Sequence, residues 1–476
     1  MLIDQSQPSV LASPQTRPIV LPPAGRLFLR ISIVVGTLFA LTTPPFQVAD
    51  ESRHFARAYE LSERTLRVLR LIPDQDGLPA RLVAVMQQTE HWQNASAPKA
   101  TPGQIWELMQ VGLQPARRAH YAETAHYTFV SYLPQIAAIV PLRLAGLNAV
   151  LTLYVARLVA LLFWITLTYR AIRIIPVAKP LLLFITLLPM TLFQAGSLSA
   201  DSVTCALSFL LIAEYLRLAY SARPITVGQL LWVGVLGAAL TAAKFVYAPL
   251  IGLYGLIPRS AFGSRAFHLA GGLFVVGMAL LVLLAPFNTL FAQATSLYLH
   301  RPADLSAAGP TPYPELNFWL SDPLNLPRTL LATASRWGRD YMDDFVGSLG
   351  WYGAYLPSYL YVTTVVMLWL TAFRSAEPFG LSGRQKGWLL LISTVITAAI
   401  CVGMSMDLRE NPQPTLQLRG IQGRYFTPFS LLIGLLMSNW VSLDQRYQRR
   451  IDALWLPFIW FLQANAYYYL IERYYF

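Results

Sequence analysis

Long apolar runs recur along almost the whole chain, separated by polar segments of very different length. A helix needs about 20 mostly apolar residues to cross a bilayer. We interpret eleven runs as membrane-spanning helices: Leu27–Thr43, Ala149–Tyr169, Pro180–Ser199, Val203–Ala219, Val227–Ala243, Val246–Ile257, Phe267–Phe287, Tyr355–Phe373, Trp388–Met404, Tyr425–Val441 and Ala453–Tyr469. The pattern predicts an all-α polytopic membrane protein with about 11 transmembrane helices.

Two polar stretches interrupt the apolar runs. In the first, basic residues recur every third position from Arg64 to Arg70 around Leu66 and Leu69, which is typical of an amphipathic helix on a membrane surface. We therefore divide the chain into an N-terminal tail (1–26), an N-terminal transmembrane module (27–287) containing the first outer loop (44–148), a second outer loop (288–354), and C-terminal transmembrane helices (355–476).

Orientation depends on whether the run Tyr127–Leu147 crosses the membrane. Pro134, Pro141 and Arg143 make it a poor span, and we interpret it as a re-entrant or surface helix. The basic short loops then all face the cytoplasm, as the positive-inside rule favours: Arg170/Arg173/Lys179, Arg217/Arg223, Arg259/Arg265, Arg374/Arg384/Lys386 and Arg446/Arg449/Arg450. The N-terminus is then cytoplasmic, and both large loops lie outside.

Composition supports this interpretation. The chain is 55% hydrophobic and only 13% charged, whereas soluble proteins carry about a quarter charged residues. The net charge of +12 would suggest nucleic acid as a partner of a soluble protein. In a membrane protein it is explained by the basic cytoplasmic loops, so we expect no nucleic acid. Two cysteines indicate neither a disulfide framework nor a zinc site.

Ionisable residues next to the apolar runs are candidate functional groups, because charge near a membrane is costly. Asp50 and Glu51 directly follow the first span. If a helix begins there, Asp50, His54 and Arg57 share one face. Two acids and a histidine suit acid–base chemistry, although acids in a first helical turn also complement the helix dipole.

Asp201 and Lys244 also lie at the outer face in this topology. Asp201 occupies a very short loop before the fourth span, where helix capping is an equal alternative to a functional role. Lys244 ends the fifth span on the side that the positive-inside rule does not explain. We favour a phosphate ligand over a side chain that merely extends to the membrane surface.

Arg424 and Tyr425 open the tenth span within a glycine-rich segment, preceded by Arg409 and Arg419. A helix N-terminus with nearby arginine can bind an anion, and the glycines permit close backbone approach. The loop 336–345 mixes charge with aromatic residues that could stack on a sugar, and its Asp343 and Asp344 could bind a metal without clear ligand spacing. No phosphate-binding loop, dinucleotide fingerprint, zinc helix or serine-nucleophile elbow is present in the sequence.

Four of these segments together resemble a bacterial membrane-protein family catalogued as domain of unknown function 2142. They are Pro45–Glu51 with His54 and Tyr59, Ser199–Asp201, Lys244 with Tyr247 and Pro249, and Gly423–Tyr425 with Pro428. That family is similar to C-type (GT-C) glycosyltransferases. The resemblance implies a GT-C-like helix arrangement, a catalytic base at Asp50 or Glu51, and a second acid at Asp201.

The resemblance further implies sugar transfer from a polyprenyl-phosphate donor to a cell-envelope glycan or lipid-linked acceptor, on the periplasmic face of the bacterial inner membrane. We expect Asp50 to act as the base of an inverting reaction, with Glu51, His54 and Asp201 supporting it. We expect Arg57, Lys244, Tyr247, Arg424 and Tyr425 to bind substrate. Membrane lipid is an expected partner, and any cofactor stays unknown, since the sequence does not require a divalent metal. The alternative is a transporter or flippase for a lipid-linked or anionic solute.

Overall fold

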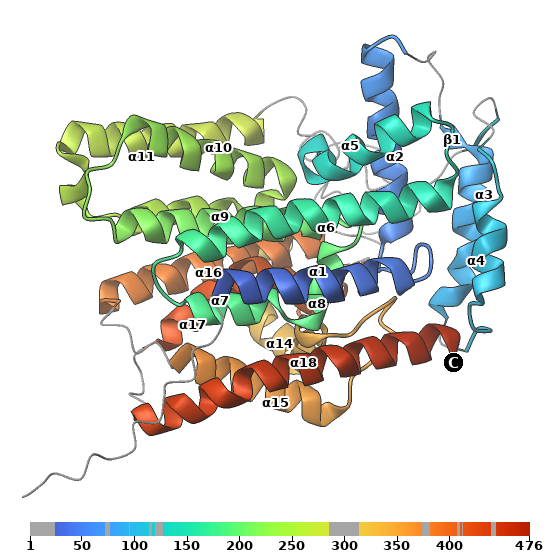
Figure 1. Cartoon of the computed structure of the whole chain (residues 1–476). Helices are drawn as coiled ribbons and strands as arrows, with labels where there is room; N and C mark the ends of the chain where they lie inside the picture. Colours follow the sequence, from blue (N-terminus) through green and yellow to red (C-terminus); the bar gives the residue numbers. More distant parts are fainter. Residues whose placement is uncertain are drawn as a thin grey trace, which may run out of the picture.

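A computed structural model describes residues 24–71, 77–94, 96–113, 117–119, 127–284, 314–373, 381–406, 410–411, 413–438 and 444–476. Most of these residues are helical, and the only sheet among them is one short strand pair. The long helices are α1 (Ala24–Thr42), α6 (Ala149–Ile174), α9 (Ala200–Ala219), α10 (Val227–Ala243), α11 (Arg265–Leu284), α15 (Ser358–Phe373), α16 (Gly383–Ser405) and α18 (Gln445–Tyr475). They form a bundle in which α6 packs between α1 and α9, while α10 packs against α11 (Figure 1).

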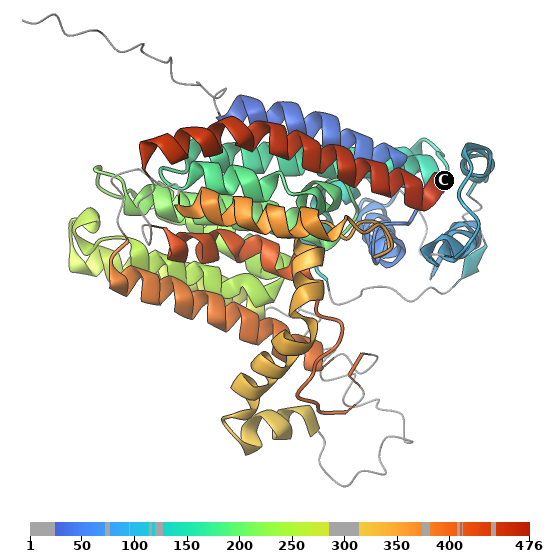
Figure 2. The same cartoon turned by 90° about the horizontal axis from the view of Figure 1, so that it is seen from below.

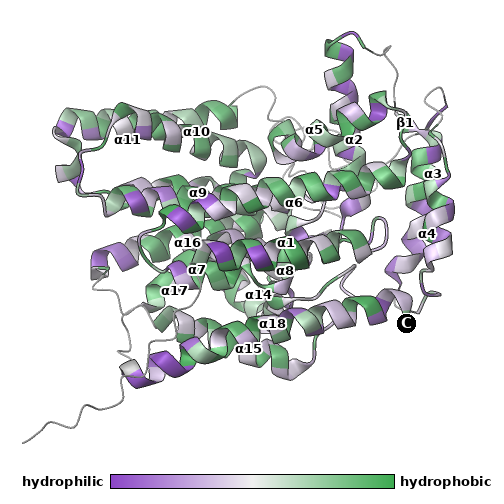
Figure 3. Ribbon diagram, viewed as in Figure 1, coloured by the Kyte–Doolittle hydropathy of each residue, from purple (hydrophilic) through white to green (hydrophobic). Residues whose placement is uncertain are grey.

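The bundle has the character of a membrane protein. Five helices, α1, α6, α9, α11 and α16, are long and apolar enough to cross a membrane, and α10 and α15 are shorter apolar helices. One face of α11 is strongly exposed, and its Leu273 and Leu284 are 75% and 80% accessible. A soluble protein rarely leaves such an apolar face uncovered. Figure 3 shows hydrophobic residues along these helices and more hydrophilic ones on the helices beside the bundle.

Three of the predicted spans differ from single α-helices. The run Pro180–Ser199 is broken into α7 (Lys179–Thr186) and α8 (Pro189–Ala195), and Tyr425–Val441 into the 3-10 helix η6 (Gly423–Phe429) and α17 (Ser430–Met437). The short run Val246–Ile257 forms a 3-10 helix, η3 (Phe245–Leu256). Each contains or adjoins a proline, which removes a backbone donor and interrupts α-helical hydrogen bonding. The number of spans in this region therefore does not follow from the helices alone.

The first outer loop forms a compact unit of short elements at one end of the bundle (Figure 1). In order they are α2 (Glu51–Val68), β1 (Leu78–Pro79), α3 (Ala80–Thr89), η1 (Glu90–Gln93), α4 (Pro102–Met109), β2 (Arg118–Ala119), η2 (Phe129–Tyr132) and α5 (Leu133–Leu144). The antiparallel pair β1–β2 is a small addition that the sequence did not indicate. The 12 residues of α5 rise about 18 Å, which is short of the roughly 30 Å hydrocarbon core.

Part of the second outer loop is also helical. It contains α13 (Pro314–Ser321) and the amphipathic α14 (Asn325–Val346), and Figure 2 shows α14 projecting from the bundle with α13 at its far end. The segment 336–345, expected as a loop, is the C-terminal half of α14. After α14 in the chain comes a turn region that contains an isolated β-bridge between Leu349 and Ala354. The small 3-10 helix η4 (Arg259–Phe262) precedes α11.

Candidate functional site

Four of the predicted residues form one chain of ion pairs. The Nζ atom of Lys244 lies 2.9 Å from Oδ1 of Asp201. The other oxygen of Asp201 lies 3.3 Å from Nε of Arg424, whose Nη2 atom lies 3.1 Å from Oδ2 of Asp50. The four residues come from the end of α10, the first turn of α9, η6 and the residue before α2. The structure thus gathers two cations and two carboxylates from segments distant in sequence.

Asp50 is directed into this chain by its backbone. It is the N-cap of α2, yet its side chain makes no capping hydrogen bond, and its φ of 61° lies in the left-handed region. Aspartate tolerates this region better than most residues. The Asp50 side chain therefore does not cap α2. With 30% of its side chain accessible, Asp50 is the most open of the four charged groups.

The side chain of Asp201 likewise does not cap its helix. Ser199 is the N-cap of α9, and its hydroxyl accepts a hydrogen bond from the Asp201 backbone N–H over 3.2 Å. The carboxylate of Asp201 is therefore available to both cations. Its side chain is 9% accessible and bridges Lys244 and Arg424, which are 12% and 4% accessible.

Tyrosine rings surround the two cations. Lys244 Nζ lies 4.3 Å from the centroid of the Tyr425 ring and 5.9 Å from those of Tyr127 and Tyr247. The hydroxyl of Tyr247 donates a hydrogen bond to the Tyr425 carbonyl over 2.9 Å. This contact joins η3 to η6. Tyr247 and Tyr425 thus line the site, as expected, while Tyr127 was not anticipated.

Arg424 retains unused hydrogen-bonding capacity. Its Nη1 atom is buried and has no hydrogen-bond partner among the described residues. A buried guanidinium donor without a partner is costly, and an anion at this position would satisfy it. The geometry therefore suits a site for a phosphate or carboxylate group beside Arg424 and Lys244.

His54 lies one helical turn after Asp50 on α2. Its Nδ1 atom forms a 2.7 Å hydrogen bond with the hydroxyl of Tyr132, and its backbone N–H donates to the Asp50 carbonyl. Burial lowers the pKa of His54 to about 4, although Asp50 and Asp201 act in the opposite direction. The imidazole is therefore neutral at neutral pH. It can orient a hydroxyl group but carries no charge.

Arg57 does not join the chain of ion pairs. Its guanidinium binds Glu60 at 2.6 Å and the carbonyl of Tyr127 at 3.3 and 3.4 Å. Arg57 thus fixes the backbone next to Tyr127, one of the rings around Lys244. This is an indirect place in the site rather than the direct contact with substrate that we expected.

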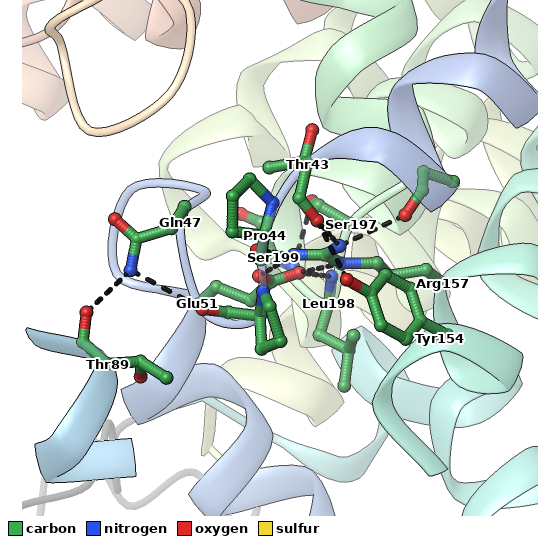
Figure 4. Close-up of polar contacts among 12 residues, drawn as sticks. Thr43, Pro44, Gln47, Glu51, Thr89, Tyr154, Arg157, Ser197, Leu198 and Ser199 are labelled. Carbon is green, nitrogen blue, oxygen red and sulfur yellow. Dashed lines mark hydrogen bonds and ion pairs between the residues drawn. The ribbon is translucent and has the colours of Figure 1, made fainter. Parts of the chain in front are cut away.

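Glu51 also lies apart from the chain of ion pairs. Its carboxylate is fully buried against Arg157 of α6, with Nε–Oε1 and Nη2–Oε2 distances of 2.9 and 2.5 Å (Figure 4). We therefore remove Glu51 from the groups that reach a substrate. Arg157 was missed in the sequence, although an arginine in the first half of a long apolar run could have revealed it.

The glycine-rich segment before η6 approaches another helix rather than a ligand. A Cβ atom on Gly423 would lie 1.9 Å from the Tyr341 carbonyl oxygen of α14. The Gly423 N–H donates to Asp344 at 3.5 Å, and burial raises the pKa of Asp344 to about 6. Gly423 is therefore the point where η6 packs on α14.

A cavity of 530 Å³ opens between α14 and the segment that leads to η6. Arg336, Trp337, Gln417 and Arg419 are among its lining residues, and the Arg336 guanidinium lies 4.3 Å from the Trp337 ring centroid. Arg409, also predicted near the site, lies outside the described residues. The volume falls in the usual range for small-ligand pockets.

Metal binding receives no support from the part of the chain that the structure describes. No group of three or more His, Cys, Asp or Glu residues there could hold a metal ion. Asp343 faces Arg339 of the same helix at 4.0 Å, while Asp344 faces Gly423. The adjacent pair therefore does not converge on one point.

Comparison with known proteins gives the family but not an activity. No curated protein and no solved structure matches the chain significantly. One family model, described as a predicted membrane protein of domain of unknown function 2142, matches residues 33–433 and so covers most of the chain. The match includes every residue of the ion-pair chain. The protein therefore belongs to this family of predicted membrane proteins (DUF2142).

Proposed function

We propose that this protein is an inverting glycosyltransferase that moves a sugar from a polyprenyl-phosphate donor to a cell-envelope glycan or a lipid-linked acceptor. The observation that carries the proposal is the chain Lys244–Asp201–Arg424–Asp50, in which a buried arginine and a partly buried lysine lie beside one partly open carboxylate. Phosphate recognition and proton removal, the two requirements of this chemistry, are thereby combined in one place.

Lys244 and Arg424 bind the donor phosphate in this proposal. When the bond between the anomeric carbon and the phosphate oxygen breaks, the phosphate keeps the electron pair and its charge grows from −1 to −2. Preorganised cations stabilise such developing charge strongly in a site shielded from water. Nη1 of Arg424, which has no hydrogen-bond partner among the described residues, is the donor that we assign to it.

Asp50 acts as the general base. It takes the proton of an acceptor hydroxyl as the hydroxyl oxygen bonds to the anomeric carbon from the side opposite the phosphate. Protonation weakens the ion pair between Asp50 and Arg424, so Arg424 becomes available to the leaving group at the same moment. Asp201 keeps both cations in place, and neutral His54 orients the acceptor.

The acceptor approaches from the outer loops. The cavity beside Trp337 and Arg419 lies along α14, and the same helix packs on Gly423 next to Arg424. Arginine, amide and tryptophan side chains suit a polyhydroxylated, anionic chain. The proposed location is the bacterial inner membrane, with a cytoplasmic N-terminus and the site facing the periplasm, because this orientation keeps the short basic loops inside.

The test is the Asp50→Asn variant, assayed for sugar transfer from polyprenyl-phosphate sugars in lipid nanodiscs. Asparagine also tolerates the left-handed conformation, so the backbone is retained and only the base is lost. We expect turnover to fall about 10²- to 10⁴-fold in a protein that still folds, since Asp201 remains a partner of Arg424. Asp322→Asn, which removes an exposed acid of the second outer loop, should keep full activity.

Two results would contradict the proposal. Unchanged transfer by Asp50→Asn removes Asp50 as the base. Movement of the intact lipid-linked donor across a liposome membrane without any sugar transfer would instead favour the alternative, a transporter or flippase that uses the same cations for binding.

A further inference from the structure

Arg157, a residue of α6, makes an unusually complete set of hydrogen bonds to other segments of the chain. A guanidinium has five N–H donors, and Arg157 uses all of them. Two bind Glu51, and the other three bind the carbonyls of Ala40, Thr43 and Pro44 at 3.0, 2.7 and 3.1 Å (Figure 4). The side chain is fully buried. Arg157 thus holds the end of α1 and the start of α2 together.

Glu51 extends this connection to a second loop. Its Oε1 atom also accepts a hydrogen bond from the backbone N–H of Leu198 at 3.4 Å. Glu51 directly follows Asp50, and Leu198 precedes Asp201 by three residues. One carboxylate therefore connects the two loops that carry the acids of the candidate site.

The loop that ends at Asp50 needs such restraint. Phe46 and Asp50 both have a φ of 61°, which is strained for residues other than glycine and most of all for a bulky one. Strained backbone persists only where its surroundings determine it strongly. Arg157, Tyr154 and Tyr474 each donate to carbonyls of this segment, at Pro44, Thr43 and Gln47 respectively.

Stability alone does not account for this buried ion pair. Apolar residues of similar volume often give stability equal to or greater than that of a buried ion pair, because burying two charges costs desolvation energy. We infer that Glu51 and Arg157 form a positioning clamp, which fixes Asp50 and Asp201 relative to one another. The inference rests on the proposed function, and neither clamp residue touches the substrate.

The decisive variant replaces both clamp residues with apolar ones, Glu51→Met with Arg157→Met. It leaves no uncompensated charge, so the protein is expected to fold. Turnover should fall about 100-fold, the loss that a displacement of about 1 Å can cause. Hydrogen exchange in peptides covering 44–51 and 197–201 should speed up, and undecaprenyl phosphate should bind more weakly.

A second variant covers the case in which the double replacement does not fold. Glu51→Asp keeps the charge but shortens the side chain, so it cannot hold Arg157 and reach the Leu198 N–H together. We expect faster exchange at 197–201 and reduced turnover. The conservative variant Arg157→Lys should also lose turnover, because lysine has three donors and Arg157 uses five.

The matched control is Glu214→Gln in α9, the helix that carries Asp201. Glu214 is equally buried and binds Arg170, Arg217 and Trp232 further along that helix. Its loss should lower the melting temperature but leave the turnover of the folded protein and exchange at 44–51 unchanged. This separates positioning from general destabilisation.

Hydrogen exchange distinguishes failure of the clamp from failure of the proposed function. If the wild type transfers no sugar, the proposed function is wrong. Hydrogen exchange and undecaprenyl phosphate binding then still test whether Glu51 and Arg157 fix the two loops. If the double variant or Glu51→Asp protects both segments as the wild type does, the clamp is overturned. Wild-type turnover in a folded double variant would overturn it equally.

Discussion

At the scale of single residues, direction matters more than residue type. Asp50 and Glu51 are adjacent acids, yet Asp50 faces Arg424 and Glu51 faces Arg157. Asp50 has a left-handed backbone, and its side chain makes no capping hydrogen bond to the helix that follows. Asp201 is released for ion pairing because Ser199 caps α9 in its place. Asp50 and Asp201 can thus both pair with cations, because neither side chain caps its helix.

The buried His54 should make stability depend on pH. Its folded pKa of about 4 lies below the usual 6.5, so between these values the unfolded chain binds a proton that the folded protein excludes. This contribution is fully present above pH 6.5 and is lost as the pH falls towards 4, by an amount on the order of 3 kcal/mol. The melting temperature of the wild type should therefore fall more steeply between pH 7 and 4.5 than that of His54→Gln. Parallel curves would show that His54 is not the titrating group.

At the scale of elements, irregular helices bring the site together. Lys244 precedes the 3-10 helix η3, and Arg424 lies in the 3-10 helix η6. Prolines within these elements prevent regular α-helical hydrogen bonding. The hydrogen bond between Tyr247 and the Tyr425 carbonyl then joins the two elements. A straight helix at either place would direct these side chains differently.

The contact of η6 with α14 gives a sharp test at this scale. Gly423→Ala would place a Cβ atom 1.9 Å from the Tyr341 carbonyl and 2.6 Å from the Phe345 backbone nitrogen. Because both are backbone atoms, the helices must separate, at a cost of about 1–3 kcal/mol. We expect a lower melting temperature and reduced turnover, since Arg424 is the next residue.

Gly338 of α14 is the matched control for Gly423. A Cβ atom there would meet nothing within 4 Å. Alanine should therefore stabilise the helix by about 0.5–1 kcal/mol, and Gly338→Ala should melt at the same or a higher temperature. Equal destabilisation by both alanine variants would mean that close packing at Gly423 is not the cause.

At the scale of the whole molecule, charged clusters lie towards opposite ends of the bundle. The candidate site gathers at the end that carries the first outer loop. Glu214 lies well along α9 from Asp201 and binds Arg170 and Arg217, near the basic loops assigned to the cytoplasm. The helices between the clusters present apolar faces outward. If the positive-inside rule holds for the basic loops, the candidate site faces away from the cytoplasm.

Cysteine labelling in intact cells tests that orientation. A membrane-impermeant maleimide should modify Gly112→Cys, in the exposed first outer loop, and leave Ala222→Cys, in the turn after α9, unmodified until the cells are broken. The native Cys205 and Cys401 are both buried and provide an unlabelled baseline. Labelling of Ala222→Cys alone in intact cells would reverse the orientation and move the site to the cytoplasm.

The sequence by itself determined the helical, membrane-embedded class and most members of the site. Both properties are local, because apolar runs predict helices and a charge beside an apolar run is conspicuous wherever the chain goes. Asp50, Asp201, Lys244 and Arg424 were recognisable for this reason. The partner of Glu51 could not be predicted from the sequence, and the run Pro180–Ser199 was wrongly predicted to be one unbroken helix.

Only the tertiary structure decided which charges meet. Asp50 and Arg424 are 374 residues apart in sequence, and Lys244 and Asp201 are 43 apart. Arg157 finds Glu51 across 106 residues. The spacing of apolar and polar residues in the sequence does not predict such pairings, because they follow from how whole helices pack. Burial then gives them their strength, since charges removed from water must find partners within the protein.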